Sequence, residues 1–189
     1  MPPEPFPIPT RRADAERNRG KILAAARTAF ADPDAEVSMA EISRRAGVGM
    51  ATLYRNFPSR RELLEALFTG EVDAVCHAAE SVGGDTPGAV LRAWLYRFFA
   101  FATTKHQVAS ELLAQSDISA PVFGESRARV LAAGRPLLAA ARRSHEVRDD
   151  LTLEQILDLI LAIATIHNDT RYVDPILQAA LDGLRPRPT

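Results

Sequence analysis

Two short helical segments separated by one glycine occupy the stretch 38–57, and this pattern restricts the fold more than any other part of the sequence. Ser38 and Glu41 have the spacing of a capping box, in which the serine oxygen accepts from the glutamate amide and the glutamate side chain reaches back. Gly47 ends the first segment, because glycine tolerates a left-handed backbone conformation. The second segment ends at Phe57-Pro58, since proline cannot continue the helical hydrogen bonds. The sequence therefore predicts two short helices joined by a tight turn.

Helical periodicity dominates the rest of the chain, and no run alternates polar and apolar residues as a half-buried strand requires. A first helix is expected over 12–31, ended by the proline of Asp32-Pro33-Asp34. A long helix follows a second capping box formed by Ser59 and Glu62. Further helices are expected over 86–104, 107–115, 121–144, 152–167 and 174–183. The predicted fold is therefore all-α, with about nine helices.

Two of these helices contain proline in a position that affects their geometry. Gly134-Arg135-Pro136 lies inside the segment 121–144 and predicts a kink there. Asp174-Pro175 is expected to open the last helix, because a capping side chain followed by proline is typical of a helix start.

The helices divide into two predicted domains, a three-helix helix-turn-helix head over 10–58 and a C-terminal helical bundle over 59–185. The helix that begins near Ser59 is expected to join them rigidly. Its capping box lies at the head, and its apolar stripe continues into the body. A change in the tilt of this helix would then couple a site in the body to the head.

Composition indicates a soluble globular protein, with 47% hydrophobic and 25% charged residues among 189. No apolar run reaches the length of about 18 residues that a membrane span needs, and Met1 to Pro9 lacks the order of a signal peptide. Cys76 is the single cysteine, which excludes an intrachain disulfide and a cysteine-cluster metal site. We therefore expect a cytoplasmic protein with no membrane partner, no metal site and no cofactor.

The outward face of the second short helix carries residue types that suit a groove of DNA. Thr52 and Tyr54 can donate to a phosphate, and Arg55 can reach a phosphate or a base edge. An ordinary helical hairpin with a solvated face is the alternative interpretation. The residues expected to point outward are Met50, Ala51, Thr52, Tyr54, Arg55 and Asn56.

A more specific pattern runs through the same region and beyond it. In order, spacing and residue type it resembles the signature of the tetracycline-repressor (TetR) family of bacterial regulators, over about 14–68. The resemblance implies a homodimer that binds a pseudo-palindromic double-stranded DNA operator, usually as a repressor released by a small-molecule effector. The segments concerned are Ala40-Glu41-Ile42, Ala46-Gly47-Val48-Gly49, Thr52-Leu53-Tyr54-Arg55-Asn56-Phe57-Pro58-Ser59 and Glu62-Leu63-Leu64.

The resemblance also assigns DNA-binding roles to individual positions. Thr52 and Tyr54 would make the family's contacts from the recognition helix, and Arg60 would take the phosphate-binding place usually held by a lysine. Three residues depart from the family pattern and bear on which operator is bound. They are Gly49 in place of a common serine, Asn56 in place of histidine or tyrosine, and Arg61 where an acidic residue is common.

An aromatic cluster in the segment 86–104 is the candidate wall of an apolar effector pocket. Its aromatic set is wider than one core stripe requires, although plain core packing explains it as well. His106 or His167 would supply the polar contact, and a structural place at a helix C-terminus is the alternative for His167. The predicted ligand-binding residues are Trp94, Phe98, Phe101, His106 and His167.

The last two helices, 152–167 and 174–184, are the predicted dimer interface. The first of them is apolar nearly all round, so one neighbour cannot cover its surface, and we expect Ile160 to face the partner. No catalytic constellation or phosphate-binding loop is present in the sequence, so we expect no enzyme. An all-helical enzyme and an interaction module that does not bind DNA are the alternative functions.

Overall fold

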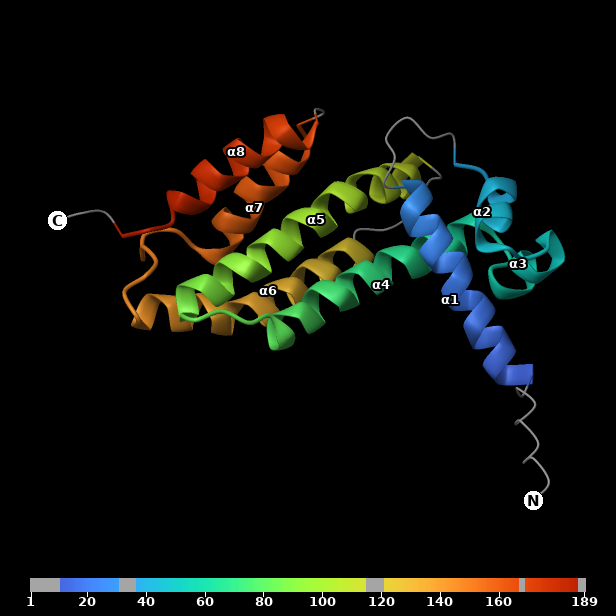
Figure 1. The fold of residues 1–189 in the computed structure, drawn as a ribbon, viewed down its shortest axis with the longest axis horizontal. Coiled ribbons are helices and arrows are strands. Elements are labelled where there is room, and N and C mark those ends of the chain that lie inside the picture. Colours follow the sequence, from blue (N-terminus) through green and yellow to red (C-terminus); the bar gives the residue numbers. More distant parts are fainter. Residues whose placement is uncertain (1–10, 31–36, 115–120, 167–168, 187–189) are drawn as a thin grey trace, which may run out of the picture. The chain divides into compact units, whose positions relative to one another are not determined.

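The computed structural model describes residues 11–30, 37–114, 121–166 and 169–186, and these residues form helices and no strand (Figure 1). The predicted all-α fold is therefore confirmed. The chain divides into two compact units, Met1–Leu67 and Phe68–Thr189, so that the division falls inside the fourth helix. The described helices are α1 (Arg11–Phe30), α2 (Met39–Ala46), α3 (Met50–Asn56), α4 (Arg60–Ser81), α5 (Pro87–Ala114), α6 (Pro121–Arg143), α7 (Leu153–Ala164) and α8 (Thr170–Asp182).

The first unit, which we call the head, is built on α1. The apolar face expected for this helix is buried, and α1 packs against both α2 and α3. From the two short helices, Ile42 and Leu53 reach this core with no exposed surface. The buried α1 side chains are Ile22, Ala26, Ala29 and Phe30.

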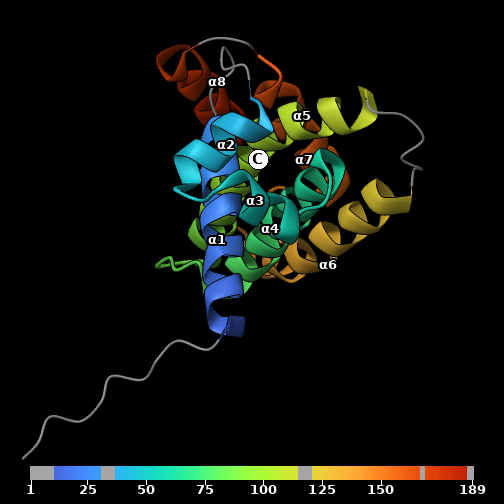
Figure 2. The ribbon, with the colours of Figure 1, turned by 90° about the vertical axis from the view of Figure 1, so that its right-hand side faces the viewer.

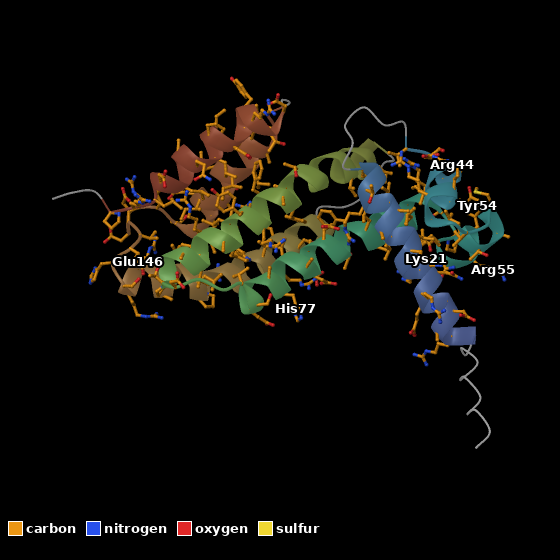
Figure 3. The ribbon with its side chains drawn as sticks, in the orientation of Figure 1. Lys21, Arg44, Tyr54, Arg55, His77 and Glu146 are labelled. Atoms are coloured by element: carbon orange, nitrogen blue, oxygen red, sulfur yellow. The ribbon has the colours of Figure 1, made fainter. Side chains whose placement is uncertain are left out.

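The second unit, which we call the body, has α5 at its centre. α5 packs against α6 and α7, and α7 packs against α8 (Figure 2). Trp94 is completely buried, and its Nε1 donates to the carbonyl of Val75 on α4, 3.0 Å away. At the first turn of α5, the Glu146 carboxylate accepts from the hydroxyl of Thr86 (Figure 3). None of the described helices combines the length and apolar character that crossing a membrane requires.

Two helix boundaries differ from the sequence prediction. The expected helices 86–104 and 107–115 are one continuous helix, α5, because no proline or glycine lies between them. Thr103 bonds within the helix, donating its hydroxyl to the Ala100 carbonyl 2.8 Å away. The last helix begins at Thr170, because Asp169 caps it by accepting from the amide of Tyr172 at 2.9 Å. The prediction that Asp174-Pro175 opens this helix is wrong.

The predicted helix caps agree with the structure more closely than the two boundaries do. Thr152 and Gln155 form a complete capping box at the start of α7. Ser38 accepts from the Glu41 amide at 3.1 Å, as expected. The Glu41 carboxylate, however, binds arginines of its own helix instead of reaching back.

The face of α7 that carries Ile160 was assigned wrongly from the sequence. Ile160 is 1% exposed and packs inside its own body, so it cannot be the residue that meets a partner chain. Its neighbour Leu159 is 44% exposed. A helix that is apolar nearly all round carries no pattern that separates its two apolar faces, which explains the error of one position.

Candidate nucleic-acid interface and body pocket

The turn between α2 and α3 is closed by hydrogen bonds on both sides of Gly47. Gly47 has φ 64° and ψ 33°, the left-handed conformation that favours glycine. The amide of Val48 donates to the carbonyl of Ser43 at 3.1 Å, and the Ser43 hydroxyl donates to the carbonyl of Val48 at 2.6 Å. Ser43 is 4% exposed and Val48 is half-buried, so this reciprocal pair lies at the edge of the core. The sequence analysis did not single out Ser43.

The inner side of α3 anchors this helix to the head. Leu53 and Phe57 are buried, with 0% and 1% of their surfaces exposed. Gly49 precedes the helix in an extended conformation and provides no side-chain cap. Its carbonyl accepts from the amides of Thr52 and Leu53, at 2.9 and 3.0 Å.

The outer side of α3 presents a mixed apolar and polar face. Met50 and Tyr54, one turn apart, are 39% and 45% exposed, so two large side chains share the same face of α3. Arg55 is exposed beside Tyr54, and both extend from α3 into solvent (Figure 3). The outer side of α3 thus exposes three of the predicted DNA-binding residues: Met50 and Tyr54 on one face, and Arg55 at the next position round the helix.

The other predicted DNA-binding residues have partners inside the head. Asn56 is half-buried, and its Nδ2 donates to the backbone carbonyl of Thr52 at 2.8 Å. Arg60 is half-buried, with its guanidinium carbon 5.7 Å from the centroid of the Phe30 ring. Arg55 also donates to a backbone carbonyl, that of Ala51, at 3.2 Å. These contacts restrict the three side chains within the head itself.

Arg19 is a head residue that the sequence analysis missed. Its Nη1 donates to the carbonyl of Asn56 at 3.3 Å, and its guanidinium carbon lies 4.4 Å from the centroid of the Phe57 ring. The contact joins α1 to the end of α3 across 37 positions of sequence. No local pattern of residues signals a contact over such a separation.

The cations of α2 are held by one carboxylate. Glu41 accepts from Arg44 at 2.7 Å and from Arg45 at 2.6 Å. The hydrogen bonds from Arg44 and then Arg45 lower the pKa of Glu41 to about 2. At neutral pH the carboxylate is therefore charged, and it offsets part of the positive charge of α2.

A pocket of about 260 Å³ lies in the body between α4, α5, α6 and α7. Phe98 and Phe101 line it, and Arg127 contributes a polar group to the wall. Arg127 makes two bonds to the Asp158 carboxylate, at 2.9 and 3.3 Å. The other lining residues are Val72, Gly124, Ser126, Val130, Leu157 and Leu161.

The remaining predicted ligand-binding residues lie elsewhere. Trp94 stacks on Phe98, with ring centroids 6.2 Å apart, and it is buried behind the pocket-lining residues rather than among them. The side chains of His106 and His167 lie outside the described residues. Phe98 in turn contacts Phe101, with centroids 5.8 Å apart, so the aromatic cluster both fills the core and borders a cavity.

A closed turn between two short helices, with an exposed face on the second, is the geometry of a helix-turn-helix motif. Residues 22–67 match the family model described as bacterial regulatory proteins, tetR family. Residues 86–186 match the model described as transcriptional regulator SbtR-like, C-terminal domain. The chain therefore belongs to the TetR family and is a DNA-binding transcriptional regulator.

Similar proteins cover the chain to different extents. A TetR transcriptional regulator from Streptomyces coelicolor is 33% identical, and the match covers 90% of this chain and 99% of that one, with a TM-score of 0.73. The TetR transcription regulatory protein from Mycobacterium vanbaalenii is 30% identical, and the match covers 93% of this chain and 99% of that one. Its TM-score is also 0.73. An uncharacterized HTH-type transcriptional regulator of Mycobacterium bovis is 37% identical over 67 residues, which span 35% of each protein.

Proposed function

We propose that this regulator is a repressor that binds a pseudo-palindromic operator as a homodimer and is released by a small-molecule effector. The observation that carries the DNA-binding half of this proposal is the exposed face of Met50, Tyr54 and Arg55 on a helix whose inner side is buried. Large apolar side chains exposed beside a cation are typical of a surface that meets a partner.

In this proposal α3 enters the major groove of DNA. Tyr54 donates to a phosphate, and Arg55 reaches a phosphate or a base edge. Met50 supplies an apolar contact for a thymine methyl group. Arg60 and Thr52, which are half-buried in the head, bind phosphates at the margin of the interface. Gly49 allows the backbone to approach the duplex closely.

The homodimer is proposed to form through the outer faces of α7 and α8. These helices pack together, and each exposes a large apolar side chain, Leu159 at 44% and Tyr172 at 56%. A two-fold axis through such a surface brings it against its own copy. The two recognition helices then meet half-sites about 34–36 Å apart, which is one turn of DNA.

The effector is proposed to be an apolar or aromatic small molecule bound in the body pocket. Phe98 and Phe101 give the pocket an aromatic wall, and Ser126 and Arg127 offer polar groups that fix the orientation of a ligand. α4 contributes Val72 to the wall and begins at Arg60 in the head. A ligand that favours another position of α4 would therefore change the spacing of the recognition helices.

Selection from a random-sequence duplex library tests the operator. The wild-type chain is expected to enrich duplexes with two inverted half-sites, and the selected duplex then serves as the probe in gel-shift experiments. A Tyr54→Ala variant should enrich nothing. If the wild-type chain enriches no duplex, or enriches single unpaired sites, the proposal of a dimer on a pseudo-palindromic operator is wrong.

A further inference from the structure

Arg19 contacts the end of α3 through two parts of its guanidinium. Nη1 donates to the carbonyl of Asn56, the last residue of α3, at 3.3 Å. The planar group also lies over the ring of Phe57, 4.4 Å from its centroid, and Phe57 is the residue that follows the helix. Because Phe57 is 1% exposed, the ring beneath the guanidinium is fixed in the core of the head.

The end of α3 needs a contact of this kind. α3 has seven residues, and helices this short are unstable in isolation. The last carbonyls of a helix lack partners within the helix and form the negative end of its dipole. A cation that donates to the Asn56 carbonyl therefore satisfies one of these groups and complements the dipole. Tyr54 and Arg55 lie in this same last turn.

We propose that Arg19 is a positioning residue for DNA recognition: it holds the last turn of α3 so that Tyr54 and Arg55 keep their place on the exposed face. This inference rests on the proposal that α3 reads the operator. Arg19 is itself exposed, so a direct bond to a phosphate is the competing role. The two roles differ in their response to salt, because each phosphate contact releases counterions and a contact within the protein does not.

Arg19→Lys and Arg19→Ala separate the two roles on the duplex that the wild-type chain selects. Lysine keeps the charge and a donor, but it lacks the planar group that stacks on a ring while it donates to a carbonyl. Both variants should lose affinity by about tenfold, which is the effect of one mismatched base pair. The salt slope, meaning the slope of the logarithm of the binding constant against the logarithm of the salt concentration, should stay at the wild-type value. If Arg19→Lys binds like the wild type, or if Arg19→Ala lowers the slope by about one, the positioning role is overturned.

Hydrogen exchange of the DNA-free protein tests the contact itself. The Phe57 amide donates to the Leu53 carbonyl at 2.9 Å, and it should exchange faster in both Arg19 variants. Arg12→Ala is the matched control, because Arg12 is a cation of α1 that pairs with Glu16. It should leave the Phe57 amide unchanged. Unchanged exchange in Arg19→Ala overturns the inference.

The two measurements also separate this inference from the proposed function. If the wild-type chain selects no duplex, the operator proposal fails, whereas faster exchange at Phe57 still shows that Arg19 holds the end of α3. If Arg19→Ala does not fold, Arg19→Lys supplies both measurements, because lysine keeps a long cationic side chain at this position.

Discussion

The indole of Trp94 lies directly against the backbone of Gly134. A Cβ atom added to Gly134 would lie 2.6 Å from Cζ3 of the indole and closer still to Cη2, well inside contact distance. The ring cannot shift away from an added Cβ atom, because Trp94 is completely buried and its Nε1 donates a hydrogen bond to the Val75 carbonyl. The α5–α6 packing of the body therefore depends on a glycine at this point of α6.

Gly134→Ala should destabilise the protein by about 1–3 kcal/mol, because the added methyl group overpacks the core. The same change at an unconstrained helical position stabilises by about 0.5–1 kcal/mol. Gly70→Ala in α4 is the matched control, since a Cβ at Gly70 meets nothing within 4 Å. Urea unfolding followed by Trp94 fluorescence measures both variants. Equal midpoints for the two would contradict the contact.

Arg55→Ala should weaken binding to the selected duplex and lower the salt slope by about one, since it removes a charged DNA contact. Tyr54→Phe removes only a neutral hydroxyl, so it should weaken binding with the slope unchanged. Arg143→Ala, which removes an exposed cation of the body, is the charge control. Affinity measured from 50 to 200 mM salt distinguishes the variants, because a protein that makes several phosphate contacts loses roughly 10³-fold or more in affinity over this range. A lower salt slope in Arg143→Ala would show that the DNA contacts another surface than the outer side of α3.

Ser43→Ala should destabilise the head by about 1 kcal/mol or more, because the part-buried Val48 carbonyl loses the donor that Ser43 provides. Ser81→Ala is the control. The Ser81 hydroxyl also donates to a backbone carbonyl, that of His77, but it does so at an exposed site, where substitutions change stability by about 0.5 kcal/mol or less. Thermal unfolding, followed by circular dichroism, compares the stabilities of the two variants. Wild-type stability of Ser43→Ala would show that the turn does not need this bond.

Leu159→Asp should produce a folded monomer, because the exposed surface of α7 is the proposed interface between two copies. Ile160→Asp should instead unfold the body, since it places a charge among buried side chains. Light scattering reports the mass, and circular dichroism reports the helix content. If the Leu159→Asp protein stays dimeric, the interface between the two copies lies on another face.

The Glu41 carboxyl should titrate with a midpoint of about 2, because Arg44 and Arg45 stabilise its charged form. A folded-state pKa below the usual glutamate value of 4.5 means that this stabilisation is complete above pH 4.5 and is lost as the pH falls toward 2. Arg44→Ala should raise the midpoint. Carbon-detected NMR of the side-chain carboxyl measures the titration, and a midpoint near 4.5 in the wild type would rule out the ion pairs in solution.

The sequence predicted those parts of the fold that depend on neighbouring residues. Gly47 marked the turn, and Ser38 and Thr152 marked helix starts, because capping acts over three or four positions. The start of α8 was missed because two capping signals compete there. Asp169 caps the helix, and Pro175 is accommodated inside it.

The parts that could not be predicted depend on contacts between distant segments. The bond from Arg19 to Asn56 spans 37 positions, and the collision that makes Gly134 necessary involves Trp94 on another helix. The choice between Leu159 and Ile160 depends on the rotation of α7 against α5, which an apolar pattern on every side leaves open.

The reciprocal bonds between Ser43 and Val48 close the α2–α3 turn from the inside and use none of the side chains on the outer face of α3. In the proposed interface, stability and sequence preference are therefore carried by separate sets of residues. Substitution of Met50 or Ala51 leaves the fold of the head intact, since substitutions at exposed sites alter stability by about 0.5 kcal/mol or less. If α3 reads the operator as proposed, a few surface substitutions can change the operator preference of the head without first disrupting its fold.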